Sequence, residues 1–214
     1  MEQVRVNIEK LVKEKLKDDY TGHDWGHIER VRSLVLHIGK NEGADLMICE
    51  LAVLLHDLID DKLVEDEDRT LQEVTRVLND EGLQEAFIKH IVEIITTMSF
   101  SKSSEKGMRT LEGKVVQDAD RLDALGAIGI ARTFMFAGAK GEAMYKSDLL
   151  PRTEPMTKEE YRHGESTAIN HFYEKLFKLK SLMNTKTGEK LAEERHRYME
   201  GFIDQFLAEW EGVK

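Results

Sequence analysis

The chain has 214 residues, of which 41% are hydrophobic, and its formal net charge at pH 7 is −10. This length suits one large domain or two small ones. The acidic balance argues against non-specific binding to a nucleic-acid polymer, because that affinity comes largely from cationic side chains. A small phosphorylated ligand stays compatible with this charge, since it needs only a local group of Lys and Arg or a metal ion.

No apolar run approaches the ~20 residues that span a bilayer, so no membrane association is expected. The first residues lack the charged-then-apolar order of a signal peptide. The one cysteine, Cys49, excludes an internal disulfide and lies between Ile48 and Leu51, which predicts a buried structural thiol. These features predict a soluble cytoplasmic protein. They leave the oligomeric state open, with a homodimer as one option.

Apolar periodicity predicts helices from the start of the chain. A first amphipathic helix carries Val4, Ile8, Leu11, Val12 and Leu16. A second helix begins after Asp24 as its N-cap and ends near Gly39 or Gly43. A third, from about Ala44, is apolar on most sides, which is typical of a central helix.

Four further helices are predicted between about residues 70 and 136. Residues 70–73 have the form of a capping box and predict the start of a fourth helix, which Gly82 stops. A fifth carries Phe87, Ile88, Ile91, Val92 and Ile95, and a polar loop follows at 99–107. A sixth carries Leu111, Val115, Val116, Ala119 and Leu122, and a Gly-Ala-rich seventh runs to about Phe136.

Both prolines, Pro151 and Pro155, lie in residues 138–157, which predicts a long loop and a candidate lid. Two long amphipathic helices, about 164–183 and 188–211, close the chain. Convincing strand alternation is absent, and a strand competes only at residues 94–97. The sequence therefore predicts an all-α fold: a single domain over 1–214, with a helical core at about 20–135 and the C-terminal helices at about 164–211.

One stretch, residues 54–62, combines an apolar run with several ionisable groups. The run ends in His56 and Asp57, followed by Asp60, Asp61 and Lys62. Burying such groups is costly unless they are paired or bind a metal. The hypothesis is that His56 and Asp57 hold a divalent cation, although an Asp-Asp-Lys run after a helix is most often a solvated end.

Two further positions offer ligands. His23 and His27 flank the start of the second helix, and either is a metal ligand or a histidine bonded to backbone near the cap. Asp120 lies four residues after Val116 and four before Ala124, on a face that is otherwise apolar. A buried carboxylate there needs a cation, which is either a metal ion or an arginine.

These motifs together resemble a known family. His27, then His56-Asp57, then Asp120 follow the H…HD…D order of the HD-domain metal-dependent phosphohydrolases. The segments 126–132 and 171–176 are similar to a bacterial YpgQ-like subgroup that includes nucleoside triphosphate pyrophosphohydrolases. The resemblance covers nearly the whole chain and implies a helical HD-domain bundle.

The resemblance also implies roles for individual residues. His27, His56, Asp57 and Asp120 are the expected ligands of a divalent metal, with Mn²⁺ favoured and Mg²⁺, Fe²⁺ or Zn²⁺ as alternatives. Asp120 is preferred over Asp118 because it lies in an Ala-Asp-x-Leu context. Asp60 is the expected general acid/base, with Asp61 as substitute. The expected substrate contacts are Lys62, Arg30, His23, Asp123, His171 and Lys175.

The expected reaction is hydrolysis of a (deoxy)nucleoside triphosphate to the monophosphate and pyrophosphate by metal-activated water. A second reading is hydrolysis of guanosine tetraphosphate, because residues 56–61 resemble the His-Asp-x-x-Glu-Asp motif of that group, with Asp60 in place of its Glu. A cyclic dinucleotide phosphodiesterase fits less well, since no Gly-Tyr-Pro follows. A metal- or nucleotide-binding module without turnover is the alternative from a different class.

Overall fold

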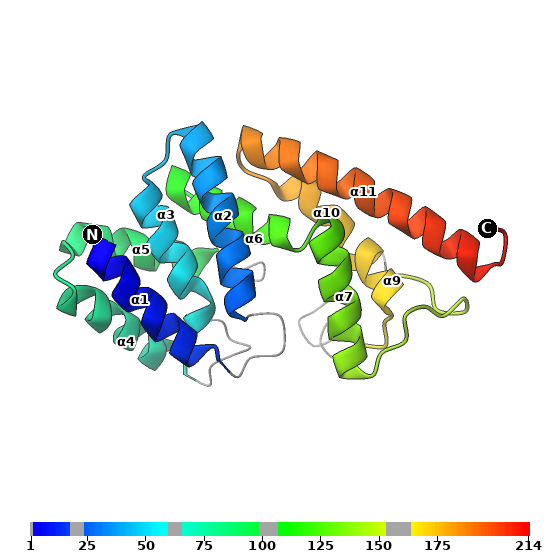
Figure 1. Ribbon diagram of the computed structural model, residues 1–214, viewed down its shortest axis with the longest axis horizontal. Helices are drawn as coiled ribbons and strands as arrows, with labels where there is room; N and C mark the ends of the chain where they lie inside the picture. Colours follow the sequence, from blue (N-terminus) through cyan, green and yellow to red (C-terminus); the bar gives the residue numbers. More distant parts are fainter. Residues whose placement is uncertain (1, 18–23, 60–65, 99–106, 153–163) are drawn as a thin grey trace. The chain divides into compact units, whose positions relative to one another are not determined.

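The computed structural model describes residues 2–17, 24–59, 66–98, 107–152 and 164–214, and within these ranges every regular element is a helix (Figure 1). The all-α prediction is therefore confirmed. The contacts of the chain group it into two compact units, residues 1–120 and 121–214, which we call unit 1 and unit 2. That the whole chain is one domain stays a prediction.

Unit 1 is built around one apolar helix. Its first elements are α1 (Glu2–Lys15), α2 (Trp25–Glu42), α3 (Leu46–Leu55) and the 3₁₀ turn η1 (His56–Ile59). Helix α3 packs against α1, α2 and α5 (Glu85–Thr97), and its residues from Ile48 to Leu55 are all buried. The sequence prediction of a central helix is thus confirmed, because a helix that is apolar on all sides needs neighbours on all sides.

The predicted helix starts in unit 1 are confirmed with one exception. Asp24 caps α2, which ends at Gly43 with φ of 78°, a left-handed conformation that glycine adopts most readily. Helix α4 (Glu67–Asp80) was expected to start with a capping box at residues 70–73, and this is wrong. The cap is Asp66, which accepts a hydrogen bond from the Arg69 amide, so Thr70 already lies inside the helix.

Helix α6 (Leu111–Asp123) leads into unit 2, whose other elements are α7 (Gly126–Lys140), α9 (Ala168–His171), the π-helical turn η2 (Phe172–Leu176), α10 (Phe177–Leu179), the 3₁₀ turn η3 (Lys180–Leu182) and α11 (Lys186–Trp210). Two predicted bounds need correction. Helix α7 runs one turn past its predicted end at about Phe136, because Gly138 lies inside the helix and does not begin the predicted loop. The helix ends at Gly141. The first C-terminal helix begins only at Ala168, after the Thr167 cap, and the π turn interrupts it.

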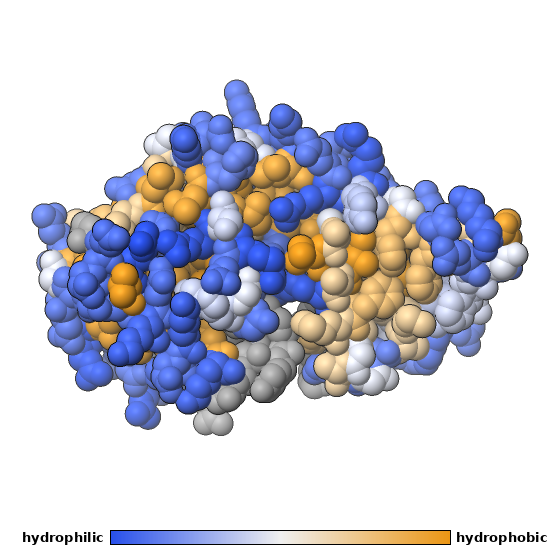
Figure 2. Space-filling model, viewed as in Figure 1, coloured by the Kyte–Doolittle hydropathy of each residue, from blue (hydrophilic) through white to orange (hydrophobic). Residues whose placement is uncertain are grey.

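Aromatic side chains from α7, η2 and α11 form the core of unit 2. Phe172 and Phe202 stack with ring centroids 6.1 Å apart, and Phe134 lies within 6.5 Å of both. One face of α7 exposes a row of apolar side chains, among them Met135 and Phe136 (Figure 2). Among the described helices none is long and apolar enough to cross a membrane by itself, and only α6 and α7, as a bent pair, have the length and composition for it.

Candidate metal centre

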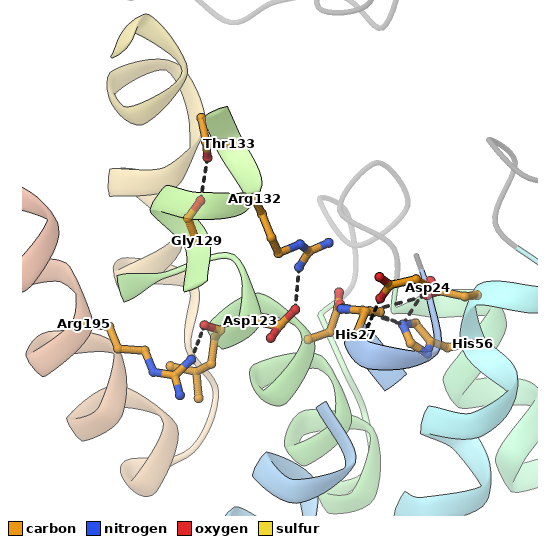
Figure 3. A network of polar contacts seen from close by, with 11 residues as sticks. Asp24, His27, His56, Asp123, Gly129, Arg132, Thr133 and Arg195 are labelled. Atoms are coloured by element: carbon orange, nitrogen blue, oxygen red, sulfur yellow. Dashed lines mark hydrogen bonds and ion pairs between the residues drawn. The ribbon is translucent and has the colours of Figure 1, made fainter. Parts of the chain in front are cut away.

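His27 lies at the start of α2, where the helix cap fixes its backbone. The carboxylate of Asp24 accepts a hydrogen bond from the His27 amide at 2.8 Å (Figure 3). Such a cap satisfies an amide that the helix itself leaves without a partner. The ring is 1% exposed, and its Nε2 faces the Nε2 of His56 at 3.4 Å. Of the two predicted histidines, the structure brings His27 to this position, whereas His23 lies outside the described residues.

His56 and Asp57 are held at the point where α3 changes into the 3₁₀ turn η1. The two neighbouring side chains lie close together there, with His56 Nε2 3.1 Å from Asp57 Oδ1. His56 Nδ1 lies 2.7 Å from the carbonyl oxygen of Val53. A carbonyl only accepts, so Nδ1 carries a proton, and Nε2 is the nitrogen that faces the other polar groups.

Asp120 joins this group from α6. Its Oδ1 lies 3.5 Å from His27 Nε2 and 3.8 Å from His56 Nε2. Asp118 is fully buried, but residues two apart on a helix point about 200° away from each other. Both carboxylates therefore cannot face the two histidines, and the structure brings Asp120 to them, as the local sequence context predicts.

His27, His56 and Asp57 have the spacing that a metal ion requires, and Asp120 lies beside them. Ligand atoms about 2.1 Å from one ion and 90–110° apart lie roughly 3.0–3.4 Å from each other. The polar atoms of His27, His56 and Asp57 lie within 4.8 Å of one another, and the distances from His27 Nε2 to Asp57 and Asp120 are both 3.5 Å. His27, His56 and Asp57 therefore fit a divalent cation, with two imidazole nitrogens and one carboxylate oxygen, and Asp120 stays the predicted fourth ligand.

The electrostatics of the group lead to the same requirement for positive charge. Burial alone lowers the pKa of His56, but the carboxylates of Asp57 and Asp120 outweigh it and raise that pKa to about 10. Burial raises the pKa of Asp120, yet His56 and His27 lower it to about 2. The buried Asp57 carboxylate and the half-buried Asp120 carboxylate, beside two buried imidazoles, thus need a cation, which is either a proton or a metal ion.

Four predicted site residues of unit 1 lie outside the described residues: the predicted acid/base residues Asp60 and Asp61, and the predicted substrate contacts His23 and Lys62. Arg30 is described, one turn after His27 on the same helix. Its guanidinium lies close to Gly26, where an added Cβ would stand 3.3 Å from Nη1 and 3.2 Å from the Asp24 carboxylate. Arg30 thus lies in the same first turns of α2 as the predicted ligand His27.

Unit 2 holds the other three predicted contacts. The buried Asp123 carboxylate forms an ion pair with Arg132 at 2.6 Å (Figure 3). Burial, with help from the charges of Lys175 and Arg152, lowers the pKa of His171 to about 4, so its ring is neutral at pH 7. A role of Asp123, His171 or Lys175 in substrate binding stays a prediction.

The sequence reasoning missed a buried ionic cluster in unit 2. Glu174, in the π turn, is 4% exposed and accepts hydrogen bonds from Arg152 Nε at 2.9 Å, Arg152 Nη2 at 2.7 Å and Ser166 Oγ at 3.0 Å. The only signal was a glutamate between Phe172 and Leu176, at a position whose neighbours are apolar. The partners of Glu174 come from loop positions that no periodicity marks.

Comparison with known proteins places these residues in a family. Residues 24–125, which include all four converging side chains, match the HD domain family. The chain is 42% identical to YpgQ of Bacillus subtilis over 214 residues, 99% of this chain and 94% of YpgQ. A solved structure of YpgQ in complex with ADP has a TM-score of 0.78 to this chain, with 41% identity over 98% of this chain and 100% of that one.

Two further solved structures are similar over nearly the same length. A protein from Lactobacillus plantarum has a TM-score of 0.85 and 45% identity, covering 99% of both chains. An HD-superfamily hydrolase from Bacillus thuringiensis has a TM-score of 0.79 and 44% identity, covering 98% of both chains. The similarity therefore extends through unit 2, beyond the HD domain match.

Proposed function

The chain belongs to the YpgQ family of HD-domain metal-dependent phosphohydrolases, and we propose that it hydrolyses nucleoside triphosphates to the monophosphate and pyrophosphate. The observation that carries the proposal is that His27, His56 and Asp57 converge with the spacing of a metal site, with Asp120 Oδ1 3.5 Å from His27 and 3.8 Å from His56. The ADP bound to YpgQ supports a nucleotide as the ligand class, given 41% identity over 98% of this chain.

In this proposal the four side chains hold one divalent cation. When bound, such an ion lowers the pKa of a coordinated water and offsets the negative charge at the attacked phosphorus. Val53 keeps His56 in the orientation that directs Nε2 to the ion, and Asp24 does the same for the backbone of His27. A mixed nitrogen and oxygen donor set suits Mn²⁺ or Fe²⁺, and we expect Mn²⁺ to support activity best.

The rest of the chemistry is assigned to residues near the ligands in sequence. Asp60, three residues after Asp57, is the proposed general acid/base, and Asp61 is its substitute. The two carboxylate ligands already balance the charge of a divalent ion, and the chain as a whole carries −10. The polyphosphate therefore needs cations of its own, and we propose Arg30, Lys62 and Lys175 for this role.

A substrate screen with product identification tests the proposal. Purified protein with Mn²⁺ is offered deoxynucleoside triphosphates, guanosine tetraphosphate and a cyclic dinucleotide. We expect pyrophosphate from the triphosphates, whereas orthophosphate would contradict the proposed reaction. Activity confined to guanosine tetraphosphate would support the alternative substrate, and nucleotide binding without turnover would support a binding module.

The role of Asp60 is tested separately from that of the metal. The Asp60→Ala variant should retain Mn²⁺ with unchanged affinity and lose turnover, because a general acid/base contributes typically 10²–10⁴-fold to the rate. Full activity of this variant would remove Asp60 from the mechanism without affecting the proposed ligands. The same substitution at Asp61 should leave most of the activity in place.

A further inference from the structure

The proposed ligand Asp120 lies three residues before the end of its helix. Helix α6 ends at Asp123, so Asp120 belongs to the last turn. The last four carbonyl groups of a helix have no partner within it, and such ends open more readily than helix centres. The side chain of Asp120 is 38% exposed, so packing around it restrains its position only in part. Whatever fixes this last turn therefore also fixes the fourth ligand.

Arg195 of helix α11 makes such a contact. Its guanidinium Nη1 donates a hydrogen bond to the carbonyl oxygen of Leu122, two residues after Asp120 (Figure 3). The same carbonyl oxygen accepts a hydrogen bond from the amide of Leu125 at 3.0 Å, so it accepts two hydrogen bonds in all. A guanidinium at the carboxyl end of a helix is favoured by the helix dipole as well.

The aliphatic part of the Arg195 side chain is also closely packed, against Gly126. Gly126, the first residue of α7, has φ of 72°, and a Cβ there would lie 3.1 Å from Arg195 Cγ and 3.2 Å from Cβ. The side chain thus lies against bare backbone at the turn between α6 and α7, and any larger residue at 126 would displace it. A second cation from α7, Arg132, pairs with the Asp123 carboxylate at 2.6 Å.

We propose that Arg195 is a positioning residue for the metal centre: through the Leu122 carbonyl it keeps the last turn of α6 wound and Asp120 in place as the fourth ligand. The inference rests on the proposed metal-binding function. Arg195 acts along the continuous helix α6, whose residues 120 and 122 are joined by the chain itself. Asp123 and Arg132 assist by pinning the residue at which the helix ends.

The test compares Arg195→Met with Arg197→Met. Methionine keeps an unbranched stem against Gly126 and loses the guanidinium donor. Arg197, two residues on along α11, is a matched control, since its side chain is 70% exposed and pairs with Glu193 at 3.5 Å. Mn²⁺ affinity is measured by titration for each variant, and thermal unfolding of the metal-free proteins shows that both are folded.

Outer contacts of metal ligands typically affect affinity by 10–100-fold, so Arg195→Met should bind Mn²⁺ roughly tenfold more weakly. Arg197→Met should bind it as the wild type does. Arg195→Lys keeps the charge without the planar fork and should lie between the two. If Arg195→Met does not fold, Arg195→Lys carries the same comparison.

A double variant separates positioning from a general structural effect. When Asp120 is replaced by Ala, Arg195 has no ligand to position, so adding Arg195→Met should weaken the residual Mn²⁺ binding, measured by titration at high Mn²⁺ concentration, no further. An equal loss in both backgrounds would overturn the proposal, and so would unchanged affinity of Arg195→Met alone. Absence of Mn²⁺ binding by the wild-type protein would instead refute the proposed function.

Discussion

Replacing Glu174 by Gln tests whether the π turn of unit 2 is held by its buried charge. The Glu174 side chain is 1% exposed and accepts four hydrogen bonds. Three come from Arg152, through its backbone amide, Nε and Nη2, and the fourth comes from Ser166 Oγ. Glutamine has the same shape, but its amide nitrogen cannot accept, so at least one of the Arg152 donors loses its partner.

The size of the effect follows from this geometry. Removing one partner of a buried ion pair costs about 3–5 kcal/mol. The Arg152 side chain is 27% exposed, so water partly replaces the lost contacts, and glutamine keeps one accepting oxygen. We expect the free energy of unfolding to fall by about 2–3 kcal/mol, which lowers the melting temperature by roughly 4–12 °C in a chain of this size.

The loss should depend on pH in a defined direction. Burial by itself raises the pKa of Glu174, but the hydrogen bonds from Arg152 and Ser166 and the charge of Arg152 lower it overall. A carboxyl group with a lowered pKa stabilises the folded state above its unfolded pKa of about 4.3, and this contribution is lost as the pH falls through the folded pKa. The difference between wild type and variant should thus be complete at pH 7 and shrink below pH 4.

The assay is thermal unfolding by circular dichroism at pH 7 and at pH 3.5. Glu165→Gln is the matched control, because Glu165 is 67% exposed and pairs with the exposed Lys146. A surface pair contributes about 0–1 kcal/mol, so this control should melt close to the wild type. Equal melting temperatures for wild type and Glu174→Gln at pH 7, or a difference that does not change with pH, would refute the reasoning.

Three further predictions concern the site and the core. Asp120→Ala should abolish Mn²⁺ retention, measured by metal analysis after gel filtration, whereas Asp118→Ala should keep the metal and melt at a lower temperature because Asp118 is fully buried. Lys175→Met should raise KM for a nucleoside triphosphate roughly tenfold in steady-state kinetics without changing Mn²⁺ affinity. Burial, with Glu112 and Asp45, raises the pKa of Cys49 to about 12, so a thiol reagent at pH 8 should label the native protein roughly a thousandfold more slowly than the urea-unfolded one.

Most of the fold could be predicted because apolar spacing reflects local geometry. The stripe from Val4 to Leu16 and the cap at Asp24 depend on residues within a few positions of each other, and α1 and α2 lie where these patterns indicate. The predicted start of α4 was wrong because Asp66 and Thr70 both have side chains that can cap a helix. Local sequence does not decide between these two caps, and the structure has Asp66. The π turn after His171 leaves no periodic signal, since it inserts one residue into an otherwise helical pattern.

The grouping of His27, His56, Asp57 and Asp120 could be predicted only in part from the residues themselves. Sequence marked ionisable groups in apolar surroundings, but which of two histidines and which of two aspartates converge depends on helix packing over about 90 residues. The resemblance to the HD family supplied that choice. Contacts made through backbone, such as the Val53 carbonyl on His56, leave no trace in side-chain patterns and required the structure.

The most direct test of the proposed reaction is hydrolysis of a deoxynucleoside triphosphate in H₂¹⁸O with Mn²⁺, with the products analysed by mass spectrometry. If water attacks the α-phosphorus, the label appears in the monophosphate and the other product is unlabelled pyrophosphate. His56→Ala, which removes a proposed ligand, should form neither product. Label in pyrophosphate or in orthophosphate would show attack at another phosphorus and contradict the account.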